Sequence, residues 1–122
     1  EAGLDFAISY KKNINFIGKD ALIKIKNKKI KKKLIFLSLI KSEPGSPLIL
    51  HDEPIYNNGK IIGRTTSANY SFNYKKNMVF GYVNSEVNLN SKDIEIEVEK
   101  KKYKVILEKK PLHDPENKII KF

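Results

Sequence analysis

Cysteine is absent from this 122-residue sequence, which excludes disulfide bonds, thiolate catalysis and cysteine-ligated metal sites. Long apolar runs are absent as well, since none approaches the roughly 18 residues that a membrane-spanning helix needs. The chain does not open on a basic segment followed by an apolar one, so nothing in it favours insertion or secretion. We therefore expect a soluble, cytoplasmic protein without a membrane partner. Because the first residue is glutamate and not methionine, we also expect a fragment of a longer polypeptide.

Arginine is nearly missing, because Arg64 is the only one among 24 basic residues. The net charge of +10 and a cluster of lysines in residues 28–33 would suit a nucleic-acid partner. Base readout and bidentate phosphate contacts, however, favour the guanidinium fork, and lysine supplies charge without that geometry. We expect no specific nucleic-acid partner. Weak attraction to polyanions stays open as an alternative function.

Motifs for self-contained chemistry are absent too. The sequence has no glycine-rich phosphate loop, no HExxH zinc motif and no GxSxG nucleophile motif. His51 stands beside Asp52 and Glu53, but neighbours on an extended chain point to opposite faces, which makes a poor ligand set. We therefore predict no catalytic residue and no metal site within this chain.

The hydrophobic pattern predicts mostly strands. Residues 4–10 alternate apolar side chains with smaller or polar ones, which predicts a half-buried strand. Residues 19–26 predict a short amphipathic helix, with Asn15 as the candidate cap. Residues 33–40 are almost continuously apolar, and a run of this length favours a buried strand over a helix.

Two hairpins follow from the turn and charge patterns. Asn57, Asn58 and Gly59 supply the positive-φ residues of a tight turn between two apolar runs. Residues 93–99 alternate carboxylates with apolar side chains, and residues 103–107 predict the opposing, lysine-bearing arm after a turn at residues 100–102. The expected fold is all-β and mainly antiparallel: a small six- to seven-stranded barrel or Greek-key domain preceded by a strand and one short helix.

Residues 61–83 are the most unusual stretch, because two apolar runs are joined by a long polar loop that holds Tyr70, Phe72 and Tyr74. Aromatic side chains in such a loop usually pack against something. Since the chain has no site of its own, we expect the loop to face another domain. Its three aromatic side chains should then be more exposed than is usual for their types.

Four motifs in order along the chain resemble the aminomethyltransferase family, that is, the glycine-cleavage T-protein and its relatives. Residues 1–4 (EAGL) and 16–22 (FIGKDAL) are similar to one passage of the family, and residues 61–83 are similar to its signature. Residues 54–59 are similar to its PI..NG hairpin. Near the end, residues 111–118 resemble the tail of the dimethylglycine and sarcosine dehydrogenase branch.

This resemblance implies the C-terminal fragment of a tetrahydrofolate-dependent one-carbon (aminomethyl) transfer enzyme, inactive alone. It implies that residues 1–30 end the folate-binding domain and that residues 31–122 form the family's C-terminal β-barrel. The implied partners are the missing N-terminal folate-binding domain and either a flavin domain in cis or a lipoyl carrier protein. In the dehydrogenase branch an upstream domain carries FAD. Two other functions stay open: a non-catalytic structural or interaction barrel, and the weak polyanion-binding module.

The resemblance also implies folate-binding residues. Glu1 matches a family glutamate that accepts hydrogen bonds from the pterin N–H groups, a role that suits a carboxylate. Lys32 stands near the position of a family arginine beside the folate and keeps its charge without its fork. Arg64 and Tyr70, with Ser67 between them, would line the folate entrance. From the residues alone, a solvated chain terminus, a solvated lysine and interdomain packing remain the alternatives.

Overall fold

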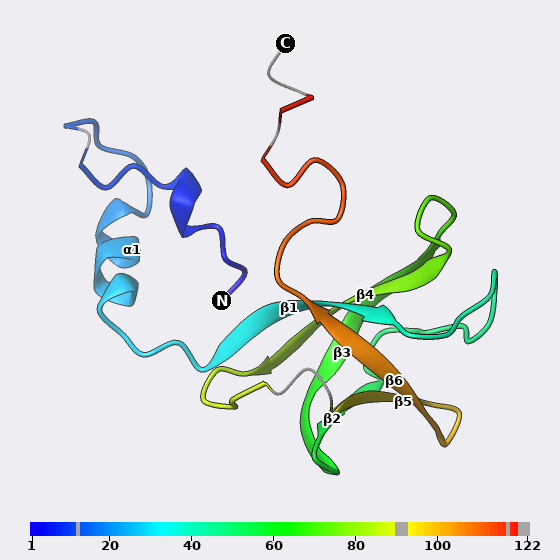
Figure 1. The fold of residues 1–122 in the computed structure, drawn as a ribbon. Helices are drawn as coiled ribbons and strands as arrows, with labels where there is room; N and C mark the ends of the chain where they lie inside the picture. Colours follow the sequence, from blue (N-terminus) through cyan, green and yellow to red (C-terminus); the bar gives the residue numbers. More distant parts are fainter. Residues whose placement is uncertain (12, 90–92, 117, 120–122) are drawn as a thin grey trace.

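The computed structural model describes residues 1–11, 13–89, 93–116 and 118–119. Its centre is a closed barrel in which the strands follow the order β1-β4-β3-β2-β5-β6, with every neighbouring pair antiparallel (Figure 1). The strands are β1 (Lys32–Leu39), β2 (Pro54–Asn57), β3 (Lys60–Ser71), β4 (Lys76–Asn84), β5 (Ile94–Val98) and β6 (Lys101–Glu108). The expected antiparallel barrel is therefore confirmed, with one short α-helix before it.

Alternation along the strands sends one set of side chains into the barrel. Each fully buried Val, Leu or Ile stabilises the fold by about 1.5–3 kcal/mol relative to leaving it exposed. The other set faces outward, and these side chains are available for contacts with other parts of a protein. The buried apolar residues are Ile35, Leu37, Leu39, Ile49, Ile55, Val79, Val83, Ile94, Ile96, Val98 and Val105.

Both tight hairpins form as predicted. Asn58 (φ 50°) and Gly59 (φ 73°) take the left-handed conformation between β2 and β3. The turn from β5 to β6 uses Glu99 (φ 50°) and Lys100 (φ 63°), so it lies at the start of the lysine run and not within it. The oppositely charged arms are confirmed at the pairs Glu95/Lys104 and Glu97/Lys102.

The long polar loop expected within residues 61–83 is wrong for most of its length. β3 continues to Ser71, and only residues 72–75 form the turn to β4. The buried Thr65 explains why a polar stretch stays in the sheet, because its hydroxyl donates to the Leu50 carbonyl (2.7 Å) and accepts from the Glu53 amide (2.9 Å). These partners lie 12 or more residues away, so no local pattern reveals them.

The segment before the barrel has no buried residue among residues 1–11 and 13–31. The strand predicted at residues 4–10 is wrong, since a 3₁₀ helix, η1 (Asp5–Ala7), forms there and Phe6 is 86% exposed. In the described part of the chain no strand pairs with it, and a strand without partners is not stable in water. The predicted helix is confirmed as α1 (Lys19–Lys26), although Gly18 and not Asn15 is its N-cap. No helix among the described residues is long and apolar enough to span a membrane.

At Gly63, β3 and β4 approach each other too closely for a side chain to fit between them. A Cβ at Gly63 would lie 2.0 Å from the Tyr82 carbonyl oxygen and 2.7 Å from Val83 Cα. Gly63→Ala is expected to lower the free energy of unfolding by about 3 kcal/mol, or to prevent folding. Gly45→Ala is the control, since nothing lies within 4 Å and only the positive φ of 76° costs about 1 kcal/mol. Equal losses in urea unfolding followed by circular dichroism would contradict this account.

Candidate functional site

The outward face of β1 and β4 presents apolar side chains to solvent. The strand register places Leu34 opposite Tyr82 and Phe36 opposite Phe80. The two phenylalanine rings stack with their centroids 4.7 Å apart, and Phe80 remains 42% exposed. Contiguous exposed apolar surface of this kind is typical of a contact site.

A groove of about 830 Å³ lies over this face, and we call it the outer groove. Residues at the N-terminus form one side of it, and the tail that follows β6 forms another. Figure 1 shows both of these segments beside β1. Its lining comprises Ala2, Gly3, Lys33, Leu34, Ile35, Phe36, Ser71, Tyr74, Met78, Phe80, Leu89, Leu107, Glu108, Lys109, Lys110, Pro111, Leu112 and His113.

Glu1 is held beside the outer groove by its backbone. Its carbonyl oxygen accepts a hydrogen bond from the Leu34 amide at 3.0 Å, and the next two residues line the groove. The pairing of β1 with β6 begins only at Phe36, so this part of β1 has a free edge that Glu1 occupies. The Glu1 side chain is exposed, and its carboxylate forms no ion pair with another described residue. The carboxylate is therefore available to donors from outside this chain.

Lys32 and Arg64 lie on the outward face of the same three strands. Lys32 opposes Asn84 on β4, and Arg64 lies across β4 from Leu34, two strand spacings or about 10 Å away. The Arg64 guanidinium donates to the Asp52 carbonyl at 2.8 Å, which fixes its position while the side chain stays exposed. The structure thus places Glu1, Lys32 and Arg64 at one end of the β1-β4-β3 surface.

Tyr70 lies apart from these three residues. It opposes Asn77 near the tip of the β3–β4 hairpin, and its ring packs edge-on against Phe72 with centroids 5.2 Å apart. Tyr70 is half-buried, whereas Phe72 is 75% exposed and Tyr74 is 36% exposed, so the predicted exposure is confirmed for the latter two. Ser71 and Tyr74 line the outer groove, which connects the hairpin tip to the same surface.

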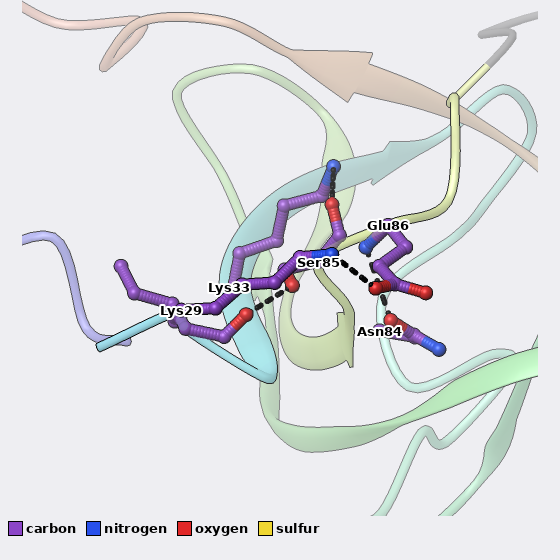
Figure 2. Close-up of polar contacts among 6 residues, drawn as sticks. Lys29, Lys33, Asn84, Ser85 and Glu86 are labelled. Carbon is purple, nitrogen blue, oxygen red and sulfur yellow. Dashed lines mark hydrogen bonds and ion pairs between the residues drawn. The ribbon is translucent and has the colours of Figure 1, made fainter.

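A second group of residues ties the chain before β1 to the turn after β4, and we call it the linker clamp (Figure 2). The Lys33 ammonium donates to the Ser85 carbonyl at 3.4 Å, as Figure 2 shows. It also donates to the Val87 carbonyl at 3.1 Å. The Ser85 hydroxyl donates to the Ile30 carbonyl, and the Ser85 amide donates to the Lys31 carbonyl at 3.0 Å. These bonds fix how the chain enters the barrel.

No sequence pattern predicts the linker clamp. Lysines 28–33 suggested only a solvated cluster, yet Lys29 pairs with Glu86 at 2.6 Å and Lys33 is half-buried. The partners are more than 50 residues apart, so only the folded barrel brings them together. The exposed pair adds little stability, about 0–1 kcal/mol. The two hydrogen bonds of Lys33 contribute more to stability, because they provide a donor for the Ser85 and Val87 carbonyls at the turn after β4.

Two tyrosines have raised pKa values. The hydrogen bond to Asp5 raises the pKa of Tyr10, and burial together with the Glu97 carboxylate raises the pKa of Tyr56. Both phenols therefore stay protonated at pH 7. Among the described residues, no group of three or more His, Cys, Asp or Glu side chains could hold a metal ion.

The linker clamp can be tested through Lys33. Lys33→Met keeps the apolar stem but leaves two carbonyls without their donor, and the free energy of unfolding is expected to fall by about 1–3 kcal/mol. Amide exchange at Ser85 should also quicken, because its bond to the Lys31 carbonyl depends on the same turn. Lys32→Met is the matched control, since Lys32 is the exposed neighbour. Equal losses of stability in the two variants would rule out a special role for Lys33.

Known proteins share both the sequence and the fold of this chain. Residues 32–114 match the family described as the glycine cleavage T-protein C-terminal barrel domain. Dimethylglycine dehydrogenase from Homo sapiens is 35% identical over 92% of this chain, and aminomethyltransferase from Bacillus subtilis is 33% identical over 93%. The aminomethyltransferase T structure from Bartonella henselae superposes with a TM-score of 0.60 at 20% identity, covering 75% of this chain and 25% of that one.

The chain corresponds to only a part of these relatives. It spans 13% of the human dehydrogenase and 30% of the Bacillus subtilis aminomethyltransferase. The residues that match the family include all six strands of the barrel, and the superposition shows the same barrel fold. The chain belongs to the glycine cleavage T-protein C-terminal barrel family, whose members include aminomethyltransferases and dimethylglycine dehydrogenases.

Proposed function

We propose that this chain is the C-terminal module of a tetrahydrofolate-dependent one-carbon transfer enzyme, and that it is inactive alone. The observation that carries the proposal is the placement of Glu1, whose backbone is bonded to β1 while its carboxylate points to no described partner. Family membership supports it, because the relatives include aminomethyltransferases and dimethylglycine dehydrogenases of which this chain spans only 30% and 13%.

The chemistry of Glu1 fits the pterin of a folate. A carboxylate offers two acceptor oxygens, and the pterin's amino and ring N–H groups are adjacent donors. Such charge-assisted hydrogen bonds are about twice as strong as neutral ones. They would therefore suit a residue that orients a ligand. Lys32 and Arg64 lie at the same end of the β1-β4-β3 surface and offer positive charge to the carboxylates of a folate. Tyr70 lies farther along β3, where a role at the folate entrance requires the upstream domain to reach the hairpin tip.

Residues 1–30, in this proposal, complete the upstream folate-binding domain, and residues 31–122 form the barrel. Several large apolar side chains of residues 1–30 are not buried by the barrel. Phe6 is 86% exposed, Ile14 is 67% exposed and Ile17 is 105% exposed. The structure gives α1 no buried residue, as expected for a helix that packs on a part outside this chain.

The branch of the family decides the other partners. The tail of residues 111–118 favours the dimethylglycine and sarcosine dehydrogenase branch, in which an FAD domain precedes the folate module. In a glycine-cleavage T-protein, the partner would be a lipoyl carrier protein. In either branch this chain supplies no catalytic residue, and its contribution is to bind and orient the folate.

A non-catalytic interaction barrel is the second candidate, and the apolar outer groove favours it. It predicts a full-length protein that folds normally and binds no folate. A polyanion-binding module is favoured only by the net charge of +10, and it predicts affinity that falls steeply with salt.

Titration of the full-length protein with tetrahydrofolate tests the proposal. Glu1→Gln is expected to weaken binding about 10-fold or more, because it removes the charge from hydrogen bonds worth about 1.5–3 kcal/mol. Glu43→Gln is the matched control, since Glu43 is an exposed glutamate in the loop after β1. Unchanged affinity in Glu1→Gln would refute the role of Glu1, and no binding by the unaltered protein would refute the folate proposal.

A further inference from the structure

We propose that a basic hollow at one end of the barrel binds a phosphate group. The hollow has a volume of about 470 Å³ and lies where the loop after β1 meets the start of β4 and Tyr103 on β6. It does not depend on the folate role, since β1 runs for eight residues from Lys32 to Leu39 and places Lys32 about 20 Å away. We call it the lysine hollow, and its polar lining includes Lys41, Ser42, Ser46, Lys75, Lys76 and Tyr103.

The charge of the lysine hollow is not neutralised by this chain. Lys41, Lys75 and Lys76 bring three ammonium groups to it, and Glu43 is the only acidic residue of its lining. In the described part of the chain, none of these three lysines forms a hydrogen bond or an ion pair. A concave surface lined by charges of one sign concentrates counter-ions, so this hollow attracts an anion.

Two of the lysines are held on a fixed backbone. Lys75 has a φ of 51°, a left-handed conformation that is uncommon for residues other than glycine. Such conformations persist where the surrounding structure imposes them, and they cluster at binding sites. Lys76 opposes Ser71 at the first position of β4 and is half-buried. An anion that binds here therefore orders little additional backbone.

Hydroxyl groups stand among the ammonium groups. The Ser42 hydroxyl accepts from the Asn77 amide at 2.8 Å, which leaves its own proton for another acceptor. The Asn77 side chain donates to the Pro47 carbonyl at 3.0 Å, so the loop after β1 is bound to the start of β4. Ser46 and Tyr103 add two further hydroxyls, and the Tyr103 ring packs against the core. The hollow thus combines positive charge with neutral donors, as the several acceptor oxygens of one anion require.

The choice of lysine favours phosphate over carboxylate. A planar carboxylate is matched best by the guanidinium fork, and the lining of the hollow contains no arginine. Lysine acts as a point charge, which suits a phosphate group with a charge of about −1.5 to −2 at neutral pH. A volume of about 470 Å³ leaves room for a small group attached to the phosphate. The ligand class is therefore free phosphate or a small phosphate monoester.

Isothermal titration calorimetry of the full-length protein tests the proposal, with inorganic phosphate and glycerol 3-phosphate as probes at constant ionic strength. Saturable binding is expected, and Lys75→Gln/Lys76→Gln should weaken it by at least about 10-fold, because hydrogen bonds to a charged group are lost. Lys24→Gln/Lys60→Gln is the matched control, since it removes the same charge at exposed lysines outside the hollow. Equal weakening in both double variants would overturn the proposal, because it indicates general attraction by the net charge.

Glu43→Gln provides a test of opposite sign. Removing the only carboxylate of the lining should tighten phosphate binding by about 2-fold or more, and unchanged or weaker binding would contradict the site. Lys41→Gln serves as a second loss variant if Lys75→Gln/Lys76→Gln fails to fold, and circular dichroism checks every variant.

The two probes distinguish the possible sources of the phosphate group. Tighter binding of glycerol 3-phosphate assigns the hollow to a phosphate monoester, and equal affinities assign it to free phosphate. Absence of saturation by about 10 mM of either probe would refute the site, and tighter binding of succinate would refute the preference for phosphate. Displacement of phosphate by tetrahydrofolate would also refute the site, because the hollow would then belong to the folate. Loss of folate binding in Glu1→Gln leaves this proposal untouched.

Discussion

Closure of the barrel through β1 is the constraint on which the other features depend. β1 pairs with β4 along most of its length and with β6 at its second half, so it joins the two ends of the sheet. Closure removes the unpaired strand edges that would otherwise invite aggregation. It also fixes the outward row of β1 beside that of β4, and this creates the stacked phenylalanine pair and the groove around it.

Only the first half of β1 is not paired with β6, and the N-terminal end of the chain bonds to β1 there. β6 ends its pairing at Phe36, and Glu1 bonds to β1 beyond that point. The linker clamp then ties the same region to the end of β4. Hydrogen bonds thus connect the barrel to the segment through which the chain enters it, and they hold the backbone of Glu1 in a defined place.

Local chemistry decided which features could be predicted from sequence. Asn58-Gly59 and the Glu/Lys arms of the second hairpin carry their information within a few residues, and α1 has a clear apolar pattern. β3 is longer than its sequence indicates, because Thr65 depends on Leu50 and Glu53. The linker clamp was invisible for the same reason. Of the candidate site, the family resemblance singled out Glu1, Lys32, Arg64 and Tyr70. Only the backbone contacts and the strand register show that the first three lie at one end of the β1-β4-β3 surface and that Tyr70 lies apart from them.

The pairing of β1 also has a consequence for biosynthesis. The partners of β1 lie about 40 to 70 residues later in the chain, so the barrel cannot close until β6 has left the ribosome. Chains of several domains generally fold from the N-terminal side during synthesis. Residues 1–31 are made before any of the strands, and none of the described residues among them is buried. Formation of the closed barrel therefore has to wait until nearly the whole sequence of its six strands has been made.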